Sequence, residues 1–116
     1  MSTFEDARGQ IADWAQQDDL AITRIHSVKG AVRGNHYHKE THQWTVILEG
    51  TTRVVSMKDG IKEDKIARKG DLVYHAPGEI HAFEALDYTE WFVFTKGPRA
   101  GDNYENDTFR LEIPLI

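Results

Sequence analysis

Short runs of β-branched and apolar residues, separated by turn residues, follow one another along most of the chain. Residues 21–28 (AITRIHSV), 45–50 (TVILEG) and 51–57 (TTRVVSM) are three such runs, and their composition favours strands. Asp59 and Gly60 follow the third run, and an Asp-Gly pair between strands predicts a hairpin. Further strands are expected over residues 61–66, 72–74, 80–85 and 89–95. This regular spacing is typical of small antiparallel barrels and sandwiches.

The two ends of the chain carry weaker strand patterns. Residues 4–20 open with a polar turn at residues 6–9 and continue with a short apolar run, for which we favour a strand over a helix. Residues 108–116 predict an edge strand, where Pro114 is tolerated. The sequence therefore predicts one all-β domain over residues 1–116, an antiparallel β-barrel or jelly roll, with a core at about residues 20–96 and with segment 1–19 and a strand at 108–113 packed on it.

Composition narrows the classes of function. The 116 residues carry a net charge of −5, and binding to a phosphate backbone depends on clustered Lys and Arg, so no nucleic-acid partner is expected. No apolar run approaches the ~20 residues that cross a bilayer, so no membrane partner is expected. The N-terminal residues hold acids and no apolar signal-peptide core, which predicts a cytoplasmic protein. Zero cysteines leave histidines, carboxylates and amides as metal ligands.

Two histidines stand close together in the run after Gly30. His36 and His38 have one residue between them, and alternate residues of a strand point to the same face. Both imidazoles can therefore reach one point in space, which suits a metal ion. Another histidine, His81, follows a Pro-Gly turn in a second block, Gly70–Phe83.

The two blocks together resemble the paired motifs of the cupin superfamily. In those motifs a Gly, an HxH pair, an acidic residue and a Gly are followed by GD, PxG and a final His. This chain has KGAVRGNHYHKETHQWTVILEG and GDLVYHAPGEIHAF in the matching order. Gln43 stands where most metal-binding cupins have Glu, and Ala76 occupies the usual proline position, with Pro77 one step later. The resemblance implies the same barrel that the strand pattern predicts.

The resemblance also implies a metal centre inside the barrel, with one divalent transition-metal ion (Mn, Fe, Ni or Zn) as cofactor. Its ligands would be three histidines and one amide: His36, His38, Gln43 and His81. His42 is the alternative to Gln43, but counting back from Gly50 favours Gln43, because strand neighbours face opposite sides. Four protein ligands on an octahedral ion leave two positions for a small-molecule substrate. An amide in place of a carboxylate leaves the ion a stronger Lewis acid.

A narrower resemblance concerns sugar chemistry. The stretch RGNHYHKETHQWTVILEG is similar to bacterial sugar-nucleotide 3,4-ketoisomerases, and DARGQIADW is similar to the start of deoxysugar 3,5-epimerases. This resemblance implies that Arg33 contacts a nucleotide phosphate or supports the site, and that His36 and His38 are acid/base candidates instead of metal ligands. Histidines, with a pKa near 6.5, supply both roles at neutral pH. Glu40 is a further candidate for moving the proton.

Three hypotheses for function follow. The leading one is a metal-binding cupin enzyme that isomerises or epimerises a carbohydrate or sugar-nucleotide intermediate. The first alternative is a metal-dependent dioxygenase or lyase that acts on a small organic acid, diketone or hydroxynitrile. The second alternative is a non-enzymatic module that binds a small ligand. The resemblance also implies a homodimer, paired through sheet edges that would otherwise stay open.

Several residues near the motifs have ordinary structural interpretations. His26 is predicted to be a structural or surface histidine, and His75 a rim histidine bonded to a loop. Phe83 is two residues beyond His81 and is expected to line the cavity. Aromatic residues in β-rich segments usually pack in the core, which we expect for Trp44, Trp91, Phe92 and Phe94.

Overall fold

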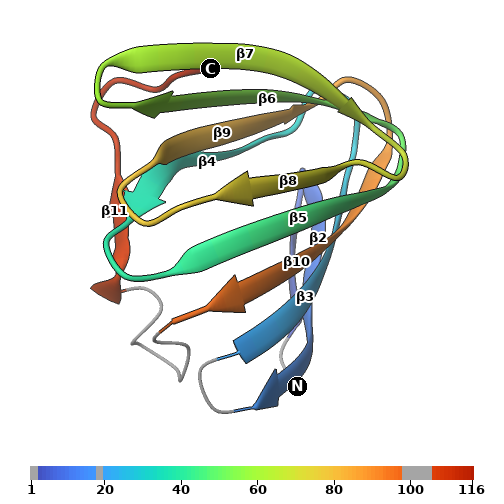
Figure 1. Ribbon diagram of the computed structural model, residues 1–116. Helices are drawn as coiled ribbons and strands as arrows, with labels where there is room; N and C mark the ends of the chain where they lie inside the picture. The colour runs from blue at the N-terminus through green and yellow to red at the C-terminus, as the bar shows by residue number, and fades with distance from the viewer. Residues whose placement is uncertain (1–2, 18–19, 98–105) are drawn as a thin grey trace.

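The structure is a computed structural model that describes residues 3–17, 20–97 and 106–116. Strands dominate these residues and pair as antiparallel neighbours (Figure 1). The strands are β1 (Thr3–Asp6), β2 (Gly9–Gln17), β3 (Leu20–Ser27), β4 (Val32–His38), β5 (His42–Glu49), β6 (Thr51–Lys58), β7 (Ile61–Arg68), β8 (Leu72–His75), β9 (Ile80–Ala85), β10 (Thr89–Lys96) and β11 (Thr108–Arg110). None of the described residues belongs to a helix with the length and apolar character that crossing a bilayer requires.

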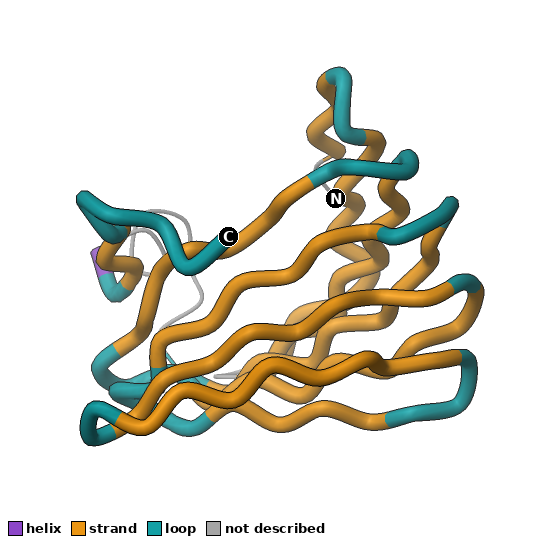
Figure 2. The backbone as a smooth tube through the Cα atoms, turned by 90° about the horizontal axis from the view of Figure 1, so that it is seen from above, coloured by secondary structure: helices purple, strands orange, loops and turns teal. Residues whose placement is uncertain are grey.

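The strands form two sheets. The larger sheet has the order β1-β2-β3-β10-β5-β8, and the smaller has the order β11-β4-β9-β6-β7. Figure 1 shows β7 of the smaller sheet at the top and the larger sheet descending from β8 to β3. In Figure 2 the loops gather at the ends of the strands. The fold is an all-β antiparallel jelly roll, as the sequence predicts.

The predicted Asp-Gly hairpin joins β6 and β7. Lys58 pairs with Ile61, and the turn residues Asp59 and Gly60 between them have φ of 53° and 77°. Positive φ at both central positions is the turn geometry that Asp-Gly favours, because it matches the twist of the two strands. The two-residue turn thereby sets the register of the whole β6–β7 pair.

The N-terminal strand prediction is confirmed. β1 and β2 form a hairpin in which Asp6 pairs with Gly9, so the polar turn lies where the sequence places it. Arg8 closes this turn, because its backbone and guanidinium both donate hydrogen bonds to the Asp6 carboxylate. Residues 18–19, which belong to the same predicted segment, lie outside the described residues.

The C-terminal strand is shorter than predicted. β11 ends at Arg110 rather than at residue 113, although it does lie at the edge of the smaller sheet, beside β4. Beyond it, the backbone N–H of Leu111 donates to the Asn35 carbonyl at 2.9 Å, and that of Leu115 donates to Asn35 Oδ1 at 2.7 Å. Because two residues four positions apart bond to one asparagine, the chain curves there and does not continue the ladder.

The barrel interior is apolar towards one end of the strands and polar towards the other. The apolar end is a packed cluster of Ile25, Ile47, Val54, Ala67, Val73, Phe83, Trp91 and Val93. The polar end holds the buried side chains of His38, Thr41, Gln43, His75 and His81. Phe83 lies between the two ends, because its ring centroid is 5.0 Å from that of Trp91 and 5.9 Å from that of His81. Phe83 therefore borders the polar end, while its predicted place in a cavity wall stays a prediction.

The core prediction for the aromatic residues is right only for Trp91. Its side chain is 2% exposed, and its Nε1 donates to Thr52 Oγ1 at 3.0 Å. Trp44, Phe92 and Phe94 are half-buried and alternate with the buried residues of β5 and β10. Alternate residues of a strand face opposite sides, so these three lie on the outer face of the larger sheet.

A bulge in β4 sets the position of the histidines. The register of β4 against β9 shifts between Gly34 and His36, and the intervening Asn35 has φ of 57°. His36 consequently pairs directly with His81. Gly34 has φ of +89°, and a Cβ placed on it would lie 2.8 Å from the carbonyl oxygen of His81. Only glycine accommodates both the positive φ and this close approach.

Gly34→Ala is predicted to destabilise the protein more than Gly30→Ala. Both glycines have φ of +89°, but no atom lies within 4 Å of a Cβ at Gly30. Backbone strain of about 1 kcal/mol is common to both variants, whereas Gly34→Ala must also push β9 away from β4, for a total of about 3 kcal/mol. Denaturant unfolding measures both losses, and equal losses would contradict a tight β4–β9 contact.

Candidate metal centre

Three histidines converge at the polar end of the interior. His36 and His38 lie on β4, and His81 lies on the neighbouring β9. One ring nitrogen from each residue lies within 4.8 Å of the other two. The ring centroids are 4.8 Å apart for His36 and His38, 4.7 Å for His36 and His81, and 5.5 Å for His38 and His81. His36 and His38 thus share a strand face, as the HxH spacing predicts, and the His81 ring on the next strand joins them.

Backbone carbonyls fix which nitrogen of two rings faces the cluster. His38 Nδ1 donates to the carbonyl of Asp107 at 3.1 Å, and His81 Nδ1 donates to the carbonyl of Glu79 at 3.2 Å. With Nδ1 carrying the proton, the lone pair of a neutral ring is on Nε2. His81 Nε2 is buried and has no hydrogen-bond partner among the described residues.

The electrostatics keep His81 neutral. Burial is the main cause that lowers its pKa well below the ordinary value of 6.5, and the neighbouring His75, His36 and His38 lower it further. Neutral imidazoles bind first-row divalent metals, and a ring N–H donated to a backbone carbonyl is the usual support for such a ligand. The residues present therefore fit a divalent metal ion.

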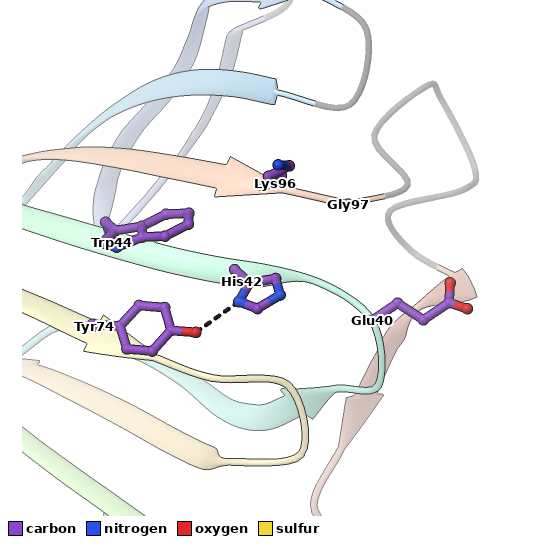
Figure 3. A pocket seen from close by; sticks show the side chains of 6 residues that line it. All are labelled: Glu40, His42, Trp44, Tyr74, Lys96 and Gly97. Carbon is purple, nitrogen blue, oxygen red and sulfur yellow. Dashed lines mark hydrogen bonds between the residues drawn. The ribbon is translucent and has the colours of Figure 1, made fainter.

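The two candidates for the fourth ligand lie on opposite faces of β5. Gln43 is 6% exposed and pairs across the sheet with the buried His75, and its Nε2 donates to Thr45 Oγ1 at 3.3 Å. His42 lies on the outer face, where its Nδ1 is hydrogen-bonded to the Tyr74 hydroxyl at 2.6 Å (Figure 3). The structure brings Gln43, and not His42, to the interior.

His42 belongs to an open groove of about 520 Å³ on the outside of the barrel. The rings of His42, Trp44 and Tyr74 pack against one another there, with centroids 5.2–6.1 Å apart. Glu40, a predicted catalytic residue, lines the same groove, is exposed, and points away from His42 in Figure 3. The structure therefore places Glu40 apart from the three interior histidines.

Arg33, the remaining predicted catalytic residue, is buried inside the barrel. It pairs with Phe83 across β4 and β9 and is 7% exposed. Its Nε donates to Ser27 Oγ at 2.7 Å, and its Nη2 donates to the His26 carbonyl at 3.3 Å. Desolvation lowers the pKa of Arg33 below its ordinary value. Among the described residues, no carboxylate lies within ion-pair distance of this guanidinium.

His75 is not the rim histidine that the sequence predicts. It is the last residue of β8, faces the interior and is 2% exposed. Burial lowers its pKa to about 4, with smaller contributions from Lys65 and His38. The prediction is wrong because the residue lies at a strand end, which suggests the rim, whereas its pairing with Gln43 turns it inward.

Asp107 is a structural support of the site that the sequence interpretation missed. Its carboxylate accepts hydrogen bonds from the backbone N–H groups of Lys39, Glu40 and Thr41 and from Thr41 Oγ1, at 2.6–3.2 Å. These bonds lower its pKa below the ordinary 3.8, although burial opposes them. Asp107 thus fixes the β4–β5 loop while its carbonyl orients His38. No local sequence signal marks this role, because it joins residues about seventy positions apart.

The fold and the site define the class: an all-β jelly roll with three convergent histidines at the polar end of its interior. The chain belongs to the cupin family, whose model, described as Cupin, matches residues 13–111. The oxalate decarboxylase OxdC of Bacillus subtilis is 30% identical over 96 residues, which are 81% of this chain and 24% of that relative. The chain thus spans about a quarter of the length of this curated relative.

Solved structures share the same fold. A capsular polysaccharide assembling protein, CapF from Staphylococcus aureus, matches with a TM-score of 0.84 at 18% identity, over 97% of this chain and 32% of that one; at this identity the likeness concerns the fold alone. A Bacillus subtilis oxalate decarboxylase, described with Mn(II) centres, matches with a TM-score of 0.82 at 25% identity, over 95% of this chain and 30% of that one.

Asp107→Ala is predicted to lower the free energy of unfolding by about 2 kcal/mol, because it removes the acceptor of four donors in the β4–β5 loop. Asp87→Ala is the matched control, since Asp87 accepts one exposed backbone bond, from Thr51 at 2.7 Å, and its loss is expected to cost about 0.5 kcal/mol. Urea unfolding compares the two variants. A loss for Asp107→Ala no larger than that of the control would contradict the role of Asp107.

Proposed function

We propose that this cupin binds one divalent metal ion through His36, His38 and His81 and uses it to act on a small, oxygen-bearing substrate. The observation that carries the proposal is the convergence of three imidazole nitrogens within 4.8 Å, two of the rings being oriented by backbone carbonyls. Gln43 is the fourth ligand that we favour, because it faces the interior and its amide oxygen is a suitable donor for Mn(II). His42 faces the outer groove instead.

The chain's own residues hold and shield this site. His36 and His38 present donors from one strand face and His81 from the next strand, while Phe83 and the apolar end behind it exclude water. A bound ion would supply positive charge that polarises a carboxylate or carbonyl oxygen of the substrate. Because the donors are imidazoles and an amide, none of them neutralises that charge.

We favour a small carboxylic acid as the substrate. The support is the 30% identity to the oxalate decarboxylase OxdC and the match to an oxalate decarboxylase with Mn(II) centres, which also favours Mn(II) as the cofactor. Arg33 gives this proposal no support, because its guanidinium donates to Ser27 Oγ and to the His26 carbonyl. Isomerisation of a keto sugar, with His36 and His38 as acid and base, is the alternative chemistry for the same residues.

His81→Ala is predicted to weaken Mn(II) binding at least about a hundredfold, because it removes one of three convergent donors. Isothermal titration of protein prepared without added metal or a histidine tag measures the affinity. His42→Ala is the control, since it removes an imidazole of the outer groove, and it is expected to bind Mn(II) like the wild type. Equal affinities for wild type and His81→Ala would exclude the proposed centre.

Activity tests the substrate class. The Mn(II)-loaded protein is expected to release CO₂ from oxalate or a related small acid, and His36→Ala is expected to lose at least about a hundredfold in rate because its metal site is incomplete. Turnover of keto sugars but not of acids would favour the isomerase chemistry. Tight binding of either class without turnover would point to a binding module.

We propose further that two copies associate through the outer face of the larger sheet. Trp14 on β2 and Leu72 and Tyr74 on β8 are 49%, 61% and 43% exposed there. The half-buried Trp44 of β5 and Phe92 of β10 lie on the same face. An apolar face of this kind is typical of an interface. Arg24 and Glu90 form an ion pair with each other on the same face, so a second copy would meet no unpaired charge from them.

Leu72→Glu is predicted to convert the dimer to a monomer, because it places a charge in this apolar face. Ile61→Glu is the matched control, since Ile61 is equally a strand residue and is 70% exposed, but lies on β7 of the smaller sheet. Size-exclusion chromatography with light scattering gives the molecular mass of the wild-type protein and of each variant. A monomeric wild-type protein, or loss of the dimer in Ile61→Glu alone, would contradict the proposal that this face is the dimer interface.

A further inference from the structure

His75 is a buried imidazole that the three-histidine cluster does not include. It comes from β8 of the larger sheet, whereas His36, His38 and His81 all come from the smaller sheet. Its ring is stacked on that of His81, with centroids 4.6 Å apart and planes inclined by 14°. The edge of the Phe83 ring and the His75 ring also meet, at 5.4 Å and 75°. His75 is therefore packed across the gap between the two sheets.

This stacking is incompatible with a shared metal ion. The lone pair of an imidazole nitrogen lies in the plane of its ring, so a ligated metal ion lies close to that plane. When two rings are stacked with nearly parallel planes, their nitrogen lone pairs lie in two separate planes and do not point to one common position. While the stack persists, the lone pairs of His75 are therefore not directed at an ion that His81 would hold. His75 can thus touch His81 without ligating the ion that His81 holds.

A backbone hydrogen bond and four neighbouring rings, those of His36, His38, His75 and Phe83, restrict the His81 ring from different directions. Its Nδ1 donates to the Glu79 carbonyl at 3.2 Å, which allows rotation about the hydrogen bond. His36 meets it at a near-perpendicular angle of 88°. Of these four rings, His75 has the plane most nearly parallel to that of His81, at 14°, so it packs along the face of the ring and opposes tilting of the plane and of Nε2 with it.

We propose that His75 is a positioning residue of the metal centre, which acts by stacking on His81 and holding its Nε2 aimed at the point shared with His36 and His38. The proposal rests on the proposed metal site and adds a contribution from the larger sheet. A flat ring of similar size, not a second nitrogen donor, is what the role requires. Phenylalanine should therefore replace His75, whereas alanine should not.

The test compares His75→Ala with His75→Phe. Titration with Mn(II) is expected to show affinity lowered about tenfold or more for His75→Ala, the range found for residues that support a ligand, and affinity within about threefold of the wild type for His75→Phe. Co(II) absorption spectra report the ligand geometry directly, and the alanine variant is expected to shift the visible bands while the phenylalanine variant retains them. Far-UV CD and thermal unfolding establish that each variant folds.

A second readout needs no metal. Nitrogen-15 NMR of the metal-free protein reports the tautomer and the ring environment of His81, which His75→Ala is expected to alter and His75→Phe to preserve. This readout separates the two proposals. A wild-type protein that binds no Mn(II) would contradict the proposed metal site, whereas the NMR result would still test whether His75 orients the His81 ring. Equal Mn(II) affinity in wild type and His75→Ala would overturn the positioning role. An equal loss of affinity in His75→Ala and His75→Phe would also overturn it, because it would show that the His75 nitrogen itself is required.

Discussion

The close pairing of β4 with β9 is the constraint on which the site depends. The bulge after Gly34 lets His36 pair directly with His81, and the absence of a side chain at Gly34 lets the backbones meet there. Without the bulge, the register would slip by one residue, and a slip of one residue turns every later side chain of a strand to the other face. The His36 and His38 rings would then face outward. The convergence of the histidines therefore depends first on the backbone geometry of β4.

The division of the interior follows from the same strands. One end holds the apolar side chains around Trp91, which supply most of the hydrophobic stabilisation of the barrel. The other end can therefore carry buried polar groups that contribute little to the stability of the fold. Those groups depend on partners outside their own strands: Asp107, about seventy positions away, for His38, and His75 of the larger sheet for His81. Holding imidazoles neutral and fixed in a dry environment is costly for folding, and the contacts from both sheets offset that cost.

Much of the fold was readable from the sequence because its signals are local. Alternation and the Asp59–Gly60 turn predict β6 and β7, and the HxH spacing predicts that His36 and His38 share a face. The inward turn of His75 and the role of Asp107 depend on pairing between distant segments, which no local pattern encodes. The outward aromatic residues, such as Trp44, were misjudged because both faces of the larger sheet are apolar, so that hydrophobicity alone does not tell inside from outside.

The chemistry of the donor set argues for an anionic ligand even though the chain as a whole carries a charge of −5. Three neutral imidazoles and the Gln43 amide would leave the two positive charges of a bound ion uncompensated. Positive charge in a poorly hydrated interior is unfavourable unless a counter-charge arrives. A small carboxylate would supply that counter-charge directly at the ion on binding, whereas the neutral keto group of a sugar would not. The Gln43 amide, where other cupins place a carboxylate, is thus the feature that most favours an acid as the substrate.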